Sequence, residues 1–128
     1  MKLTFLTSAA LVLSVIGFAS TAAAQDADPT DYLAWDQAAP SLVEAQAYVY
    51  RGYKDGATAG EVLTPVTCAG AASPYACQVL FPAFVPGPHA IAVSAANSGG
   101  ESLPSVPLKF IFVVVPQIPT SLRMVKQP

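Results

Sequence analysis

The stretch FVPGPHAIAVSAANSGGESLPS, residues 84–105, decides the fold class of this chain. From residue 89 to residue 96 it alternates with a period of two, which predicts a β-strand. Successive side chains of a strand point to opposite faces, so we expect a core face formed by His89, Ile91, Val93 and Ala95. A shift of register by one residue would exchange the two faces. The outward face should therefore consist of Ala90, Ala92, Ser94 and Ala96.

The rest of the chain shows short segments of similar character, each bounded by Pro, Gly, Ser or Asn. The further expected strands are residues 32–36, 46–54, 61–68, 77–81 and 108–115. Asp55 and Gly56 supply a hairpin turn after the second of these. Residues 41–48 have a helical composition, but we interpret them as a loop that leads into a strand. Short strands at spacings of about 8 to 12 residues predict an all-β chain folded as a β-sandwich or small barrel.

At this point the chain resembles a known family. Residues 84–105 are similar to the F strand, the F–G loop and the start of the G strand of a fibronectin type III domain. LAWD, residues 33–36, resembles the B strand of that family, and YVYRGYKDG, residues 48–56, resembles its C strand and the following turn. The resemblance covers residues 32–115. It implies an immunoglobulin-like β-sandwich that serves in adhesion, spacing or protein recognition rather than in catalysis.

The first residues are typical of a signal peptide. Lys2 precedes an apolar run over residues 3–18, and small alanines follow at residues 22–24, so we expect cleavage after residue 24. A retained membrane anchor is the alternative, but the run is short and is interrupted by Ser14 and Gly17. We therefore expect an exported protein in the periplasm, at the cell surface or outside the cell, with no transmembrane span after cleavage.

The two ends of the expected module depart from the family pattern. Only residues 25–31, QDADPTD, precede the B strand, and we interpret them as an acidic flexible leader. The missing A-strand pattern occurs instead as IPTSLRMV, residues 118–125, within the C-terminal segment 116–128. We expect Leu122 and Met124 to be buried in the vacant A-strand place, because the B-strand edge would otherwise stay unpaired. The strand would come from its own chain or from a neighbouring copy, and an idle stub is the alternative.

The two cysteines, Cys68 and Cys77, flank a turn-like segment. An exported chain meets an oxidising compartment, so this even count and short spacing predict one disulfide that closes a hairpin. Zinc binding is the alternative, but two thiolates with His89 do not complete a tetrahedral site. We expect no metal site.

Composition and motifs argue against several function classes. The net charge of −2 at pH 7 is unfavourable for nucleic-acid binding. The aspartates at residues 26, 28 and 31 lack the glycine and the distal acid of a calcium loop. His89 is the only histidine and matches the corner aromatic of the family, so we expect it to pack or to bond to the backbone. We expect no catalytic residues, no cofactor and no enzymatic activity.

Two kinds of partner fit this sequence. The first is a protein, or another copy of the chain, held by an outer sheet face and the F–G loop. The candidate binding surface is Tyr50, Tyr53, Ala92, Ser94, Asn97, Ile111 and Val113. The second is carbohydrate, which would stack on an exposed strip of tyrosines formed by Tyr50, Tyr53 or Tyr75.

Overall fold

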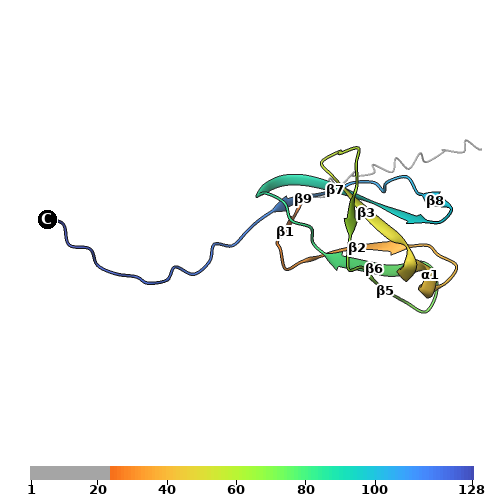
Figure 1. Ribbon diagram of the computed structural model, residues 1–128, viewed down its shortest axis with the longest axis horizontal. Coiled ribbons are helices and arrows are strands. Elements are labelled where there is room, and N and C mark those ends of the chain that lie inside the picture. The colour runs from red at the N-terminus through yellow and green to blue at the C-terminus, as the bar shows by residue number, and fades with distance from the viewer. Residues whose placement is uncertain (1–23) are drawn as a thin grey trace, which may run out of the picture.

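The computed structural model describes residues 24–128, which form strands joined by turns and one short helix (Figure 1). In chain order the elements are β1 (Gln25–Ala27), β2 (Tyr32–Gln37), α1 (Leu42–Ala47), β3 (Val49–Lys54), β4 (Glu61–Leu63), β5 (Thr67–Ala69), β6 (Tyr75–Leu80), β7 (Gly87–Asn97), β8 (Gly100–Glu101) and β9 (Leu108–Phe112). The expected signal peptide, residues 1–24, lies outside the described residues except for Ala24.

The strands form two sheets that pack face to face. One sheet has the order β1-β9-β7-β3-β4, with β8 paired to β7, and the other has the order β2-β6-β5. All pairings are antiparallel except that of β1 with β9, which is parallel. The chain is an all-β sandwich, as the sequence predicts.

The strand at the centre of the larger sheet, β7, has the predicted register. It pairs with β3 so that Tyr50 lies opposite Ala95, and it pairs with β9 so that Phe110 lies opposite His89. Tyr50, Ile91 and Phe110 are buried, which places the expected inner set on the core side. The strand β9 ends at Phe112, so the expected strand 108–115 is shorter than predicted, and Val114 is exposed.

Residues 61–68 do not form the single strand expected from their sequence. They contribute β4 to the larger sheet and most of β5 to the smaller sheet, and residues 64–66 cross between the two. Pro65 lies at this crossing. Proline has no backbone N–H to donate to a strand ladder, so a change of sheet is favoured there.

Residues 42–47 form α1 rather than the expected loop. Its N-cap is Ser41, whose hydroxyl accepts a hydrogen bond of 3.2 Å from the backbone N–H of Glu44. A serine followed three residues later by glutamate is the sequence signature of a helix N-terminus. This signature favours a helix here although the segment has only six residues. Ala45 is the buried residue of the helix and packs against the core.

The segment expected to be a flexible acidic leader is ordered. Gln25–Ala27 is β1, and Ala27 is buried beside Phe112. A turn then carries the chain to the smaller sheet, because Asp28 accepts hydrogen bonds from the backbone N–H of both Thr30 and Asp31. The edge of the larger sheet is therefore occupied by the N-terminal residues.

The core has two parts along the length of the sandwich. At one end Tyr50 packs on Trp35 with ring centroids 5.0 Å apart, next to the bond between Cys68 and Cys77. At the other end four phenylalanines from both sheets contact one another: Phe81, Phe84, Phe110 and Phe112. The expected disulfide is confirmed, and its residues lie directly opposite each other on β5 and β6.

Candidate functional site: an unpaired strand edge and a projecting tail

The strand β2 is at the edge of its sheet and has no neighbour on its outer side in the described residues. The backbone N–H of Phe81 donates to the carbonyl oxygen of Asp31, so Asp31 and Phe81 are a hydrogen-bonded pair of the ladder with β6. Along antiparallel strands, such hydrogen-bonded pairs alternate with pairs whose backbone groups point away from each other. The backbone groups of Tyr32, Ala34 and Asp36 therefore point away from β6, toward the open side.

The other edge of the same sheet is protected. The side-chain amide of Gln46, in α1, accepts a hydrogen bond of 2.7 Å from the backbone N–H of Cys68 in β5. The same amide donates to the carbonyl oxygen of Val66. Because unpaired strand edges invite association, this cover leaves β2 as the accessible edge of the smaller sheet.

The C-terminal residues form no strand, which corrects one of the two expected arrangements. Residues 114–128 extend away from the sandwich, beyond the end of β9 and Val113, whose backbone N–H still bonds to Ala27 (Figure 1). Leu122 and Met124, which were expected to be buried, are 99% and 88% exposed. Ile118 and Val125 are also exposed. The tail therefore does not fill a strand position in its own domain.

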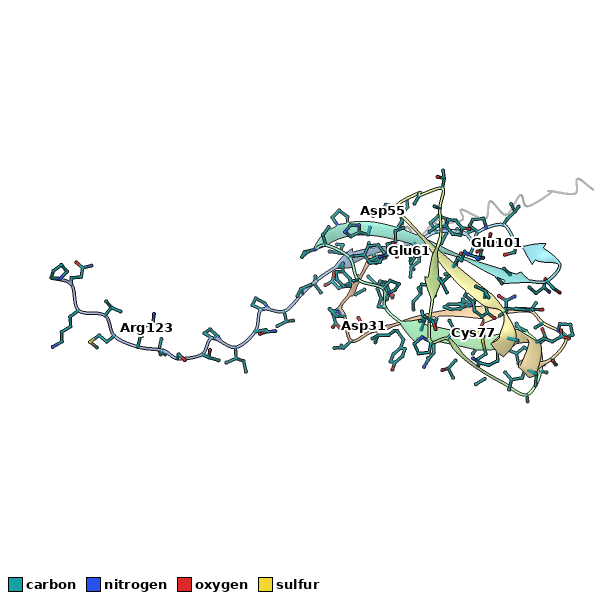
Figure 2. All side chains as sticks on the ribbon, in the orientation of Figure 1. Asp31, Asp55, Glu61, Cys77, Glu101 and Arg123 are labelled. Atoms are coloured by element: carbon teal, nitrogen blue, oxygen red, sulfur yellow. A yellow bond between two sulfur atoms is a disulfide. The ribbon has the colours of Figure 1, made fainter. Side chains whose placement is uncertain are left out.

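The β2 edge and the tail carry charges of opposite sign. Asp31 and Asp36 are exposed at the start and near the end of β2, whereas the tail carries Arg123 and Lys126. Figure 2 shows Asp31 at the end of the sandwich from which the tail leaves, and Arg123 far out along the tail. The edge and the tail of one molecule are therefore of opposite charge and separated.

Two hollows border the open edge. One of about 260 Å3 lies at the start of β2 and is lined by Asp31 and Tyr32 together with Phe81 and Phe110 of the core. The other, of about 400 Å3, lies at the opposite end of β2, beside Gln37. Both are lined by residues of both sheets, so the seam between the sheets is incompletely filled at each end of β2.

Comparisons of this chain with protein-family models, with curated proteins and with solved structures found no match. In residues 24–128 no helix is long and apolar enough to cross a membrane. Within the same range, no three His, Cys, Asp or Glu side chains gather in an arrangement that could hold a metal ion. The function of the chain is therefore inferred from the geometry of its described residues.

The residues of the expected binding surface are not brought together on one accessible face. Tyr50 is 1% exposed and belongs to the core, because its side chain faces inward from β3. Ala92 and Ser94 are on the outer face as expected but are buried. Tyr53 is half-buried over them, while Asn97, Ile111 and Val113 are exposed.

The outer face is covered by the protein's own chain. Glu101 accepts hydrogen bonds of 2.6 Å from the hydroxyls of Tyr53 and Ser94, and it lies 3.7 Å from Arg51. These hydrogen bonds hold the pKa of Glu101 below its usual value, and the bond from Ser94 has the larger effect. Ser105, from the segment before β9, also bonds to both backbone groups of Val93. A polar cluster thus closes the part of the expected surface around Tyr53 and Ser94.

The tyrosine strip required for sugar stacking is also not formed. Tyr50 and Tyr75 are buried, and of the three candidates Tyr53 alone reaches the surface. Its hydroxyl is held by Glu101. Carbohydrate recognition by these tyrosines is not supported by this arrangement.

His89 is bound through both ring nitrogens. Its Nδ1 is 2.7 Å from a carboxylate oxygen of Asp55, and its Nε2 is 2.7 Å from the carbonyl oxygen of Val85. Both partners are acceptors, so the doubly protonated ring satisfies both contacts. The hydrogen bond with Asp55 raises the pKa of His89. Neither nitrogen is free to take a proton from a substrate, and the ring packs on Phe84.

The open β2 edge lies beside Leu33, at the strand position that the C-terminal segment was expected to fill. Within the described residues this position has no strand, and the tail is exposed. Sequence reasoning missed that β1 would pair with β9, because a three-residue acidic segment shows no strand periodicity.

Proposed function

We propose that this protein is an exported, non-catalytic module that makes protein–protein contacts, in the first instance with further copies of itself. One observation carries the proposal: in the described part of the chain, β2 has an unpaired edge, and an exposed apolar tail leaves the sandwich separately. Monomeric proteins usually blunt or cover such features, because they promote association.

Other observations are consistent with this function. The disulfide is compatible with an oxidising compartment outside the cytoplasm. Both nitrogens of the single histidine are occupied, so the residue most suited to acid–base chemistry is engaged structurally. The strand order, with three strands facing a larger sheet, also supports our proposal of a relationship to fibronectin type III domains.

The test is the oligomeric state of the mature chain, residues 25–128. We expect light scattering to show a mass above that of the monomer, increasing with protein concentration. Residues 25–115 should be monomeric under the same conditions, because they lack the tail. A monomer at every concentration for both chains, with equal melting temperatures, would refute self-association.

A further inference from the structure

We infer that residues 120–127 of one copy dock as an added strand on the β2 edge of a second copy. The inference rests on the proposed self-association and names the two surfaces that make it. It assigns the vacant strand position next to β2 to the tail of another molecule.

The edge provides a complete set of backbone partners for one more strand. The N–H and C=O groups of Tyr32, Ala34 and Asp36 point outward, and no hydrogen bond within residues 24–128 uses them. The strand is six residues long, whereas the edge strands of the larger sheet, β1 and β4, have three residues each. Main-chain hydrogen bonds supply much of the affinity when a segment is added to a sheet, so the longest edge is the best acceptor.

The tail provides a suitable strand. Proline occurs at residues 116, 119 and 128, but residues 120–127 contain none, so every residue of this segment can donate a backbone hydrogen bond. Leu122 and Met124 are two positions apart and would share one face of an extended strand. Arg123 would lie on the other face.

The two faces of the added strand match the two faces of β2. Leu33 and Trp35 face the core, so Leu122 and Met124 would lie beside them at the seam between the sheets. The hollows at the two ends of β2 give this seam room for further apolar side chains. On the outer face Arg123 would lie opposite Ala34 and diagonal to the exposed Asp36, which a long arginine side chain can reach.

The geometry favours a neighbouring molecule over the same molecule. Residues 114–119 leave the sandwich as an extended segment containing Pro116 and Pro119 (Figure 1). An extended connection of this length spans roughly 20 Å. To reach its own β2, the tail would have to reverse direction within this proline-containing connection. Because each copy has one tail and one acceptor edge on different surfaces, successive docking would build head-to-tail chains.

The sole tryptophan reports on the acceptor edge directly. Trp35 is part of β2, and its buried indole N–H has no hydrogen-bond partner within the described residues. A peptide of residues 116–128 is titrated into the chain of residues 25–115 while the fluorescence of Trp35 is recorded. We expect a saturable change in emission. No change up to millimolar peptide would overturn the inference.

Matched variants identify the two surfaces. The double variant Leu122→Asp/Met124→Asp should weaken peptide binding and self-association by about tenfold or more, because two charges would enter the seam. The control Gln117→Asp/Ile118→Asp adds the same charge to exposed tail residues that lie in the peptide but outside the docking segment, and it should leave both unchanged. Equal effects of the two double variants would contradict docking by residues 120–127.

The acceptor edge is tested with Ala34→Pro, which removes one outward N–H at an exposed position of an edge strand. We expect the variant to melt cooperatively but to lose peptide binding. If the full mature chain associates while Ala34→Pro and Leu122→Asp/Met124→Asp associate equally well, this inference fails and the proposed function stands. If the full chain does not associate at all, the proposed function itself fails.

Discussion

The hydroxyl of Tyr50 donates a hydrogen bond of 2.7 Å to the carbonyl oxygen of Ala45, and this contact joins the core of the sandwich to α1. Ala45 is fully buried, and Gln46 next to it covers the β5 edge. The tyrosine predicted to face a ligand therefore holds in place the helix that protects one edge of the smaller sheet.

Replacing Tyr50 with phenylalanine should lower the free energy of unfolding by about 1 to 2 kcal/mol, because the Ala45 carbonyl loses a buried partner. Tyr48→Phe is the control, since Tyr48 lies on the same segment and its hydroxyl has no hydrogen bond within residues 24–128. Urea denaturation of both variants provides the measurement. Equal loss in the two would mean that the bond to Ala45 contributes nothing specific.

The same phenol should affect stability at high pH. Burial raises the pKa of Tyr50 to about 12 from its ordinary value of 10.0. The unfolded chain then releases the proton at lower pH than the folded chain, so the free energy of unfolding should fall as pH rises from about 10 to 12. Absorbance titration of tyrosinate should show a late component that is missing in Tyr50→Phe. A titration identical in both proteins would contradict burial of this phenol.

The disulfide should contribute measurably to stability. Replacing both cysteines with alanine should lower the free energy of unfolding by roughly 2.5 to 3 kcal/mol on the chain-entropy model. The bond itself is checked by intact mass after alkylation, with and without reductant. Two thiols alkylated in unreduced, exported protein would show that Cys68 and Cys77 are not joined outside the reducing cytoplasm.

The contact between His89 and Asp55 should make the free energy of unfolding depend on pH, with one limit set by each residue. Hydrogen bonds from the backbone of Ala90 and from His89 lower the pKa of Asp55 below 3.8, and the bond to Asp55 raises the pKa of His89 above 6.5. The aspartate contribution is fully present above pH 3.8 and is lost as pH falls through the folded-state pKa. The histidine contribution is fully present below pH 6.5 and is lost as pH rises through its raised pKa.

We therefore expect the melting temperature to decrease as pH rises above about 6.5, and we expect His89→Gln to remove most of that decrease. His89→Tyr should fold, whereas His89→Ala should melt at a lower temperature because packing on Phe84 is lost. Lys54 also lowers the pKa of Asp55, in the same direction as His89, so it does not alter the sign. A pH profile unchanged by His89→Gln would assign the dependence to other groups.

Glu101 should matter for stability although it is on the surface. Glu101→Ala removes the shared acceptor of Tyr53 and Ser94, and Ser94 is only 2% exposed. We expect a clear drop in melting temperature, because a buried hydroxyl would lose its partner. Glu61→Ala is the control, since Glu61 makes one exposed ion pair, with Lys54, and such pairs contribute little. A control that melts as low as Glu101→Ala would contradict the role of the polar cluster.

The sequence by itself determined the five longer strands (β2, β3, β6, β7 and β9), which face of β7 points inward, and which cysteines pair. These features depend on the periodicity within each strand, on the Asp55-Gly56 turn and on the short spacing of the two cysteines. All three are properties of residues close together in the sequence. The backbone of that turn has positive φ at both residues, as its type requires. The missing A-strand pattern also indicated which edge needs a neighbour, the one beside Leu33 and Trp35, although the tail does not fill it within the described residues.

Only the tertiary structure decided how the edges and faces are used. The pairing of β1 with β9, the transfer of residues 61–68 between sheets, and the burial of Tyr50 and Ser94 depend on residues far apart in the chain. A strand pattern predicts that a residue faces outward, but it does not predict whether another segment covers that residue. Glu101 and Ser105 cover part of β7 in this way. The physical reason is that periodicity is a property of one strand, whereas the cover of a face and the pairing of an edge are properties of its neighbours.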